Sequence, residues 1–144
     1  MSQNQDRDRD EAGRARQARP RDELGRPLPY GETGVEPVSE DPLPPHETID
    51  KALALVREGR PFSAHEVLEA RWKAGPVEER DLWQGLAQVC VAMTHAARGN
   101  TVGAARLFDR AAERLTTFAA TGRGAYGLDL DLAVKQARSH VGIF

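Results

Sequence analysis

The sequence predicts an all-α fold, a single-domain bundle of about five helices with an extended or disordered N-terminal arm. Three observations support this prediction. From residue 48 onward, apolar residues recur at helical spacing and no segment alternates at the period of a strand. Gly and Pro interrupt this region at intervals that suit helices. The 144 residues suffice for one domain with a core and are too few to expect two.

The N-terminal region divides into two segments of different composition. Residues 1–20 alternate Arg with Asp and offer little apolar surface, which predicts a disordered tail. Residues 21–47 are rich in Pro and Gly but include Leu24 and Leu28. We expect an extended arm that lies across the helical body, with a free linker as the alternative. The helical domain then covers residues 48–144.

Two helices are expected before residue 76. The first ends at Gly59 and carries an apolar stripe at i, i+3, i+4 and i+7. The stripe consists of Ile49, Ala52, Leu53 and Val56. The second begins at Ser63, where Ser63 and Glu66 match a capping box, and ends at Gly75. We therefore predict that these two side chains form a structural cap.

Three further helices complete the predicted bundle. The third runs from about Glu78 to Arg98, the fourth from about Val102 to Ala120, and a shorter fifth covers residues 131–140. The fourth helix has an apolar face opposite a charged one. Its inward residues are Ala104, Leu107, Phe108, Ala111, Leu115 and Phe118.

The third helix contains a run, Leu82 to Ala97, without Asp, Glu, Lys or Arg. Its core face consists of Leu82, Leu86, Val89, Cys90, Met93 and Ala97. The opposite side carries Gln84, Gln88 and His95. A face open to solvent normally carries charges, so we expect this helix to be central and covered on both faces. Buried polar groups then need partners, since each unpaired group costs about 1–3 kcal/mol.

The second helix offers such partners. His65 and Glu69 lie one turn apart on the same flank, so they can form a hydrogen bond. With Gln84, Gln88 and His95 they are expected to form a polar centre between the second and third helices.

Three interpretations of this centre remain open. In the first, it is a satisfied polar network that fixes helix packing. In the second, it lines a pocket for a small polar ligand or for acid–base catalysis by His65, Glu69 and His95. In the third, the same three residues bind a divalent metal. The spacing H-E-x-x-E matches the zinc motif H-E-x-x-H only in part.

Other side chains add to these interpretations. Gln84, Gln88, Trp72 and Arg98 are candidate ligand-binding residues. A tryptophan can line a pocket or simply fill a core. An arginine at a helix C-terminus can bind an anion, or it can interact favourably with the helix dipole. Cys90 lies on the core face, where a small apolar filler is expected rather than a nucleophile.

Composition excludes several classes of function. The net charge of −2 without a basic stretch disfavours nucleic-acid binding. No apolar run reaches the roughly 20 residues that span a bilayer, and the N-terminus lacks a signal-peptide core. The single cysteine cannot form an internal disulfide. A soluble cytoplasmic protein is therefore expected.

The run GRPFSAHEVLEARWK, followed by LWQGLAQVCVAMTHAARGN and GAARLF, resembles a bacterial family of domains of unknown function, numbered 309. That family is marked by an AHEvLE-W segment, a QGL-Q segment, a downstream His and a GN-x-x-GA turn. Here the marks are Ala64 to Glu69 with Trp72, Gln84 to Leu86 with Gln88, then His95, Gly99, Asn100, Gly103 and Ala104. The resemblance covers roughly residues 21–118 and implies a small α-helical protein, without a reaction, substrate or cofactor.

The leading functional prediction is a ligand-binding or interaction module with a partly buried His/Glu/Gln site. One alternative is a small metal-dependent hydrolase-like or acid–base enzyme that uses His65, Glu69 and His95. Another is a purely structural partner protein that uses the charged face of the fourth helix. The expected partner is a small polar ligand or a protein, and the sequence leaves homo-oligomers open.

Overall fold

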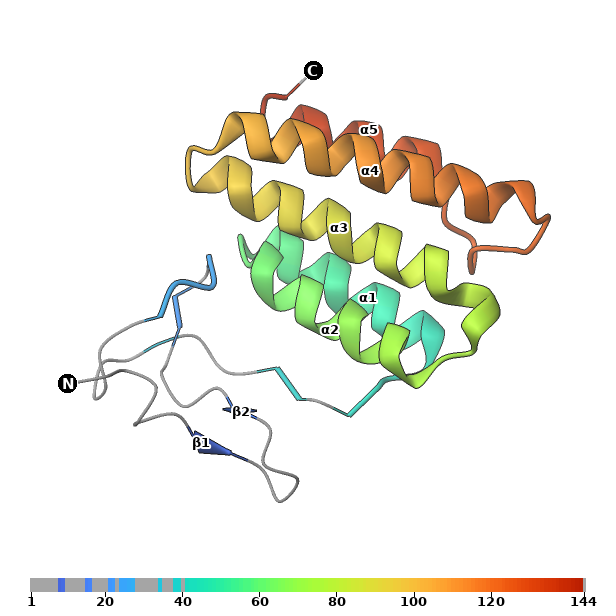
Figure 1. Ribbon diagram of the computed structural model, residues 1–144, viewed down its shortest axis with the longest axis horizontal. Helices are drawn as coiled ribbons and strands as arrows, with labels where there is room; N and C mark the ends of the chain where they lie inside the picture. The colour runs from blue at the N-terminus through green and yellow to red at the C-terminus, as the bar shows by residue number, and fades with distance from the viewer. Residues whose placement is uncertain are drawn as a thin grey trace.

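A computed structural model describes residues 8–9, 15–16, 21–22, 24–27, 34, 38–39 and 41–143 of the chain. Its α-helices are α1 (Pro45–Arg57), α2 (Pro61–Ala74), α3 (Arg80–Ala97), α4 (Thr101–Ala120) and α5 (Leu130–His140), and a 3-10 turn, η2 (Val77–Glu79), precedes α3 (Figure 1). Two short strands, β1 (Asp8–Arg9) and β2 (Ala15–Arg16), pair antiparallel. The predicted all-α bundle is confirmed. Most of the predicted tail and part of the predicted arm lie outside the described residues.

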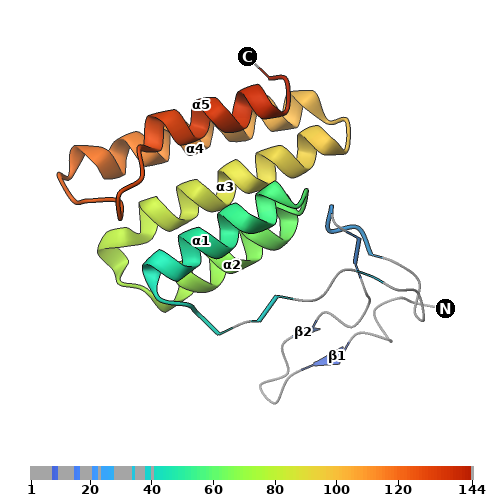
Figure 2. The ribbon, with the colours of Figure 1, turned by 180° about the vertical axis from the view of Figure 1, so that it is seen from behind.

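The helices form two layers. In Figure 1, α2, α3 and α4 lie side by side with α3 in the middle, and α1 and α5 lie behind them, as Figure 2 shows from the other side. Helix α3 packs against both α2 and α4, while α1 packs on α2 and α5 packs on α4. The charge-free helix is therefore central, as its composition predicts.

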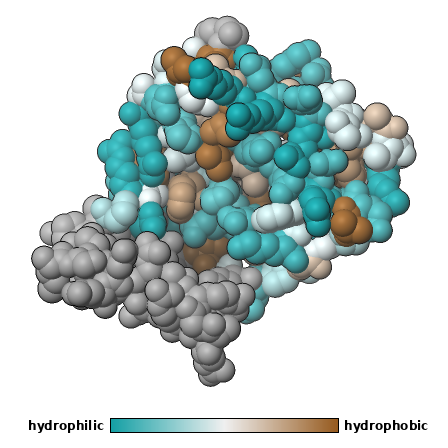
Figure 3. Space-filling view, in the orientation of Figure 1, coloured by the Kyte–Doolittle hydropathy of each residue, from teal (hydrophilic) through white to brown (hydrophobic). Residues whose placement is uncertain are grey.

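The core lies between the two layers. The largest fully buried side chains are Trp83, Phe108, Phe118, Leu55, Leu82, Leu115 and Thr48. The inward face predicted for the fourth helix is confirmed at every position except Leu107, which is half-buried. Gly85 of α3 allows α4 to come close, because a Cβ atom at this position would overlap the Leu115 side chain. The layer facing the viewer in Figure 3 has a predominantly hydrophilic surface.

Two helices begin earlier than the sequence predicts. Helix α1 begins at Pro45 and α2 at Pro61, because proline has a preset helical φ and needs no hydrogen bond for its missing N–H. The predicted cap at Ser63 and Glu66 is wrong. Ser63 is a buried residue of the first turn of α2, and its hydroxyl lies 3.3 Å from Arg60 Nη2.

The part of the arm nearest the helices is attached to them. Val38 and Leu43 pack against the core, and Arg71 Nη1 donates a hydrogen bond to the Leu43 carbonyl at 3.0 Å. The Thr48 hydroxyl donates to the same carbonyl at 2.9 Å. No helix among the described residues combines the length and apolar character needed to cross a membrane.

Candidate functional site

His65 and Glu69 form the predicted pair on α2. His65 Nε2 lies 3.0 Å from Glu69 Oε2, and Lys73 Nζ lies 3.3 Å from the other carboxylate oxygen. The imidazole also contacts the Phe62 ring, with the two ring centroids 5.3 Å apart. His65 Nδ1 is buried and has no hydrogen-bond partner among the described residues. Glu69 thus orients the imidazole through one nitrogen and leaves the other available.

The two glutamines of α3 do not join this pair. Gln84 Oε1 accepts a hydrogen bond from Arg114 Nη1 of α4, and the same nitrogen lies 3.2 Å from Asp81 Oδ1. Gln84 therefore links α3 to α4, whereas the sequence predicts a link to α2. Gln88 follows one turn later, and its Oε1 is buried without a partner in the described part of the chain.

His95 belongs to the turn between α3 and α4. His95 Nδ1 lies 3.0 Å from Asn100 Nδ2, and Asn100 Oδ1 accepts the Gly103 N–H at 3.0 Å. Asn100 is thereby the N-cap of α4. A side chain at position 103 would overlap the Asn100 amide, which explains the spacing of the GN-x-x-GA segment. His95 positions a helix cap.

The other candidate ligand-binding residues have separate surroundings. Trp72 is half-buried and packs against the core. Arg98 is exposed, and its Nη2 donates to the Leu24 carbonyl of the arm. Neither contact involves the His65–Glu69 pair.

Within the described residues, the five predicted residues make one hydrogen bond to each other, between His65 and Glu69. The predicted metal site is wrong. No three His, Cys, Asp or Glu side chains in this part of the chain come together as a metal ion requires, and His95 is paired with Asn100. The acid–base role of His65 and Glu69 stays a prediction. Cys90 is a buried core residue, as expected, and burial raises the pKa of its thiol to about 12.

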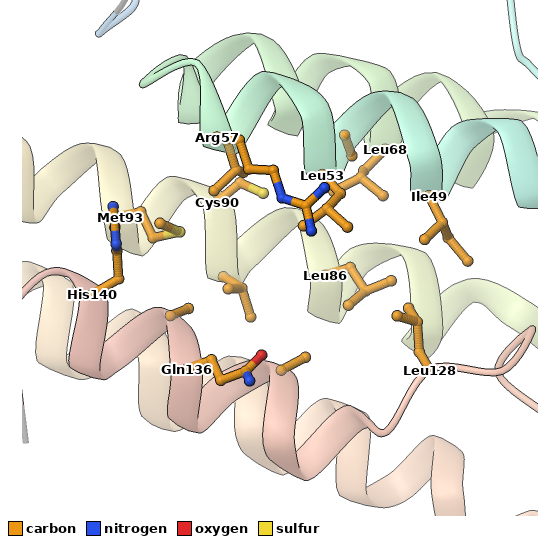
Figure 4. A pocket seen from close by; sticks show the side chains of 15 residues that line it. Ile49, Leu53, Arg57, Leu68, Leu86, Cys90, Met93, Leu128, Gln136 and His140 are labelled. Atoms are coloured by element: carbon orange, nitrogen blue, oxygen red, sulfur yellow. The ribbon is translucent and has the colours of Figure 1, made fainter.

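A cavity that the sequence does not predict lies between α1 and α5, with α3 as its floor (Figure 4). We call it the α1–α5 cavity; its volume is about 410 Å³. Its lining residues are Ile49, Ala52, Leu53, Val56, Arg57, Leu68, Leu86, Val89, Cys90, Met93, Leu128, Ala133, Gln136, Ala137 and His140. Most of them are apolar.

The cavity has a simple steric origin. Helix α5 presents Ala133 and Ala137 to this space, and their short side chains do not reach α1. The core face of α1 is formed by Thr48, Ala52 and Leu55. The predicted core stripe of α1 therefore shares only Ala52 with this core face; all four of its residues line the cavity, and Leu53 remains 44% exposed. The sequence signal for this cavity is therefore the apolar stripe of α1, which is larger than the face that packs in the core.

Three polar side chains border the cavity. Arg57 extends from α1 and Gln136 from α5, and both point into the space between the two helices (Figure 4). His140 lies near Met93 at one end of the cavity. An apolar chamber with a permanent positive charge and an amide at its opening can hold an amphipathic molecule.

Residues 49–107 match the family model described as "Domain of unknown function (DUF309)". The Bacillus subtilis (strain 168) protein described as "Uncharacterized protein YpuF" is 47% identical over 47 residues, which make up 32% of this chain and 27% of that relative. The chain thus spans about a quarter of that relative's length. No solved structure matches the chain. The sequence resemblance is confirmed over residues 49–107, which match this family model.

Proposed function

We propose that this protein is a binding module for an amphipathic molecule with an apolar body and one anionic group. The observation that carries the proposal is the α1–α5 cavity of about 410 Å³. Ligand cavities typically measure roughly 300–1,000 Å³ and combine an apolar lining with a few polar groups. The α1–α5 cavity meets these criteria.

The apolar body of the ligand would lie along the floor of the cavity. Leu86, Val89 and Met93 of α3 form this floor, and Leu53 of α1 flanks it. Each methylene group removed from water contributes about 0.8 kcal/mol, so an alkyl chain gains affinity with each carbon that fits. An occupant would also cover the exposed part of Leu53.

The anionic group would lie at the Arg57 guanidinium. Arg57 forms no ion pair with a described carboxylate, so its charge is available at the cavity opening. A guanidinium donates two parallel hydrogen bonds to a carboxylate. The Gln136 amide, on the facing helix, offers a further donor.

Isotope-labelled protein titrated with decanoate, and separately with decanol, tests the proposal by NMR. We expect amide shifts along α1 and α5 with decanoate. Ala137→Leu should abolish them by filling the cavity, whereas Ala119→Leu, on the exposed face of α4, should bind like wild type. Arg57→Gln should weaken the binding of decanoate about tenfold, roughly 1.4 kcal/mol, and leave the affinity for decanol unchanged. Shifts that avoid both helices, or that survive Ala137→Leu, would refute the proposal.

A second candidate uses three of the five residues of the predicted polar centre, His65, Glu69 and Gln88. It is supported by His65 Nδ1 and Gln88 Oε1, two buried polar atoms without a partner in the described residues. A polar ligand that bonds to them would remove an energetic cost. The stability of a His65 variant, discussed below, tests this candidate.

A further inference from the structure

The arm contains a short turn that is organised by its own hydrogen bonds. Asp22 Oδ1 accepts the N–H groups of Leu24 at 3.0 Å and Arg26 at 2.8 Å. The Gly25 N–H donates to the Asp22 carbonyl, and the Asp22 N–H donates to the Arg26 carbonyl, both at 3.0 Å. Arg21 Nη1 donates to the Gly25 carbonyl at 2.6 Å. These bonds define what we call the arm turn, residues 21–22 and 24–27.

The arm turn is docked on the helical body at the start of α2 and the end of α3. Gly25 is buried, and a Cβ atom on it would overlap the Phe62 ring. The Arg21 guanidinium lies over the same ring, 5.7 Å from its centroid. On the α3 side, Arg98 donates to the Leu24 carbonyl. Two body residues therefore hold the arm turn through a glycine, a main-chain oxygen and a cation.

This mode of contact is a form of peptide recognition. The backbone of the arm can pack against the Phe62 ring only where the residue has no Cβ atom, so the ring selects glycine. It also attracts the guanidinium four residues earlier through a cation–π contact. The arm turn belongs to the same chain, so its effective concentration at this site is on the order of millimolar. Even a weak contact is therefore maintained.

We propose that Phe62 and Arg98 form a recognition site for a polypeptide turn with glycine at the contact and arginine four residues before it. The arm turn is the built-in occupant of this site, and a partner protein that presents a turn of the same chemistry displaces it. The site lies beside His65, whose ring contacts Phe62.

Gly25 permits a closely matched pair of variants. Gly25 and Gly59 have the same φ of +76°, but nothing lies within 4 Å of a Cβ atom at Gly59. Gly25→Ala and Gly59→Ala therefore impose the same backbone strain, while only the first meets Phe62. In full-length protein, we expect Gly25→Ala to accelerate amide exchange at Leu24 and Arg26 at least tenfold. Gly59→Ala should leave these rates at the wild-type value.

A synthetic peptide, RDELGRP, with the sequence of residues 21–27, tests recognition directly. We expect it to shift the amides of Phe62 and Arg98 in Gly25→Ala, with at least fivefold weaker binding to wild type, where the site is occupied. RDELARP should not bind, and adding Arg98→Gln should weaken RDELGRP binding at least fivefold. Circular dichroism verifies that each variant keeps its helices, and Arg98→Gln alone, an exposed substitution, should also accelerate exchange of the arm turn.

Three outcomes would overturn the proposal. The first is equal exchange rates in Gly25→Ala and Gly59→Ala. The second is a peptide that fails to bind Gly25→Ala, or that binds equally well with alanine in place of glycine. The third is a wild-type protein with the mass of a dimer that becomes monomeric in Gly25→Ala, because the occupant would then be the arm turn of a second copy.

Discussion

The Tyr126 hydroxyl donates a hydrogen bond to Glu79 Oε2, joining the loop after α4 to the residue just before α3. The other oxygen of this carboxylate accepts the indole N–H of Trp83 at 3.0 Å. Tyr126 also stacks on Trp83, with centroids 5.8 Å apart. The hydrogen bond to Glu79 is the main cause that raises the Tyr126 pKa above its usual value, with burial and the Glu79 charge adding and Arg71 opposing.

This raised pKa makes stability depend on pH in the alkaline range. An unfolded chain releases the tyrosine proton near pH 10, about its ordinary pKa, before the folded protein does. The Tyr126 contribution to the free energy of unfolding is therefore complete below about pH 10 and is lost as pH rises through the folded-state pKa. Tyr126→Phe should be less stable at neutral pH and should decline less above about pH 10 in urea titrations. Cys90 contributes equally in both proteins, and parallel declines would contradict the assignment.

Substitution of Gly85 tests the close approach of α3 and α4. An added methyl group would overlap Leu115, which is 2% exposed and so has little room to move. Overpacking typically costs 1–3 kcal/mol, while alanine gains about 1 kcal/mol of helix propensity. Gly85→Ala should therefore lower the free energy of unfolding by up to about 2 kcal/mol in urea titrations, instead of raising it as an unhindered helical Gly→Ala substitution would. Gly124→Ala, at a loop position with no neighbour within 4 Å, is a control without steric contact and should lose less than about 0.5 kcal/mol.

Cys90 should be unreactive in the folded protein. Its thiol is buried and its pKa is about 12, so very little thiolate is present at neutral or mildly alkaline pH. We expect a disulfide reagent to label Cys90 only as fast as the protein opens, with full labelling in denaturant. Decanoate should slow labelling further, because Cys90 lines the α1–α5 cavity. Rapid labelling without denaturant would show that the cavity admits solvent and reagents to its floor.

Replacing His65 distinguishes a ligand site from a packing network. His65→Leu removes a partly exposed contact with Glu69 and a buried nitrogen that has no partner among the described residues, so stability should change by no more than about 1 kcal/mol. Arg114→Leu should cost about 1–3 kcal/mol, because it leaves Gln84 and Asp81 without their shared donor. Thermal unfolding measures both. A loss with His65→Leu as large as with Arg114→Leu would mean that the imidazole holds the helices together.

Local sequence signals were sufficient to predict the helices but not their starting points. The apolar period and the glycines are properties of each segment, so they predict the helices and the central place of α3. The helices start at Pro45 and Pro61, before the predicted positions, because proline suits the first helical position although it adds nothing to the apolar period. Ser63 matches a capping residue by type, but it lies inside the first turn of α2.

The candidate site depended on information that a helical wheel does not contain. A wheel shows that Gln84 and His95 share a face of α3, but it does not identify the neighbour across that face. For Gln84 the neighbour is Arg114, thirty residues away, and for His95 it is the following turn. The α1–α5 cavity depends in the same way on the short reach of Ala133 and Ala137, which matters only once α1 lies opposite them.

The main contacts of each helix are with its neighbours in sequence, from α1 with α2 through to α4 with α5. Chains whose contacts are local close only short loops, and they reach the native state in microseconds to milliseconds. This protein should therefore fold fast, by adding one hairpin of helices after another. The C-terminal helix can also unfold locally. Because α5 has few contacts with α3, its amide hydrogens should exchange before those of the central helix.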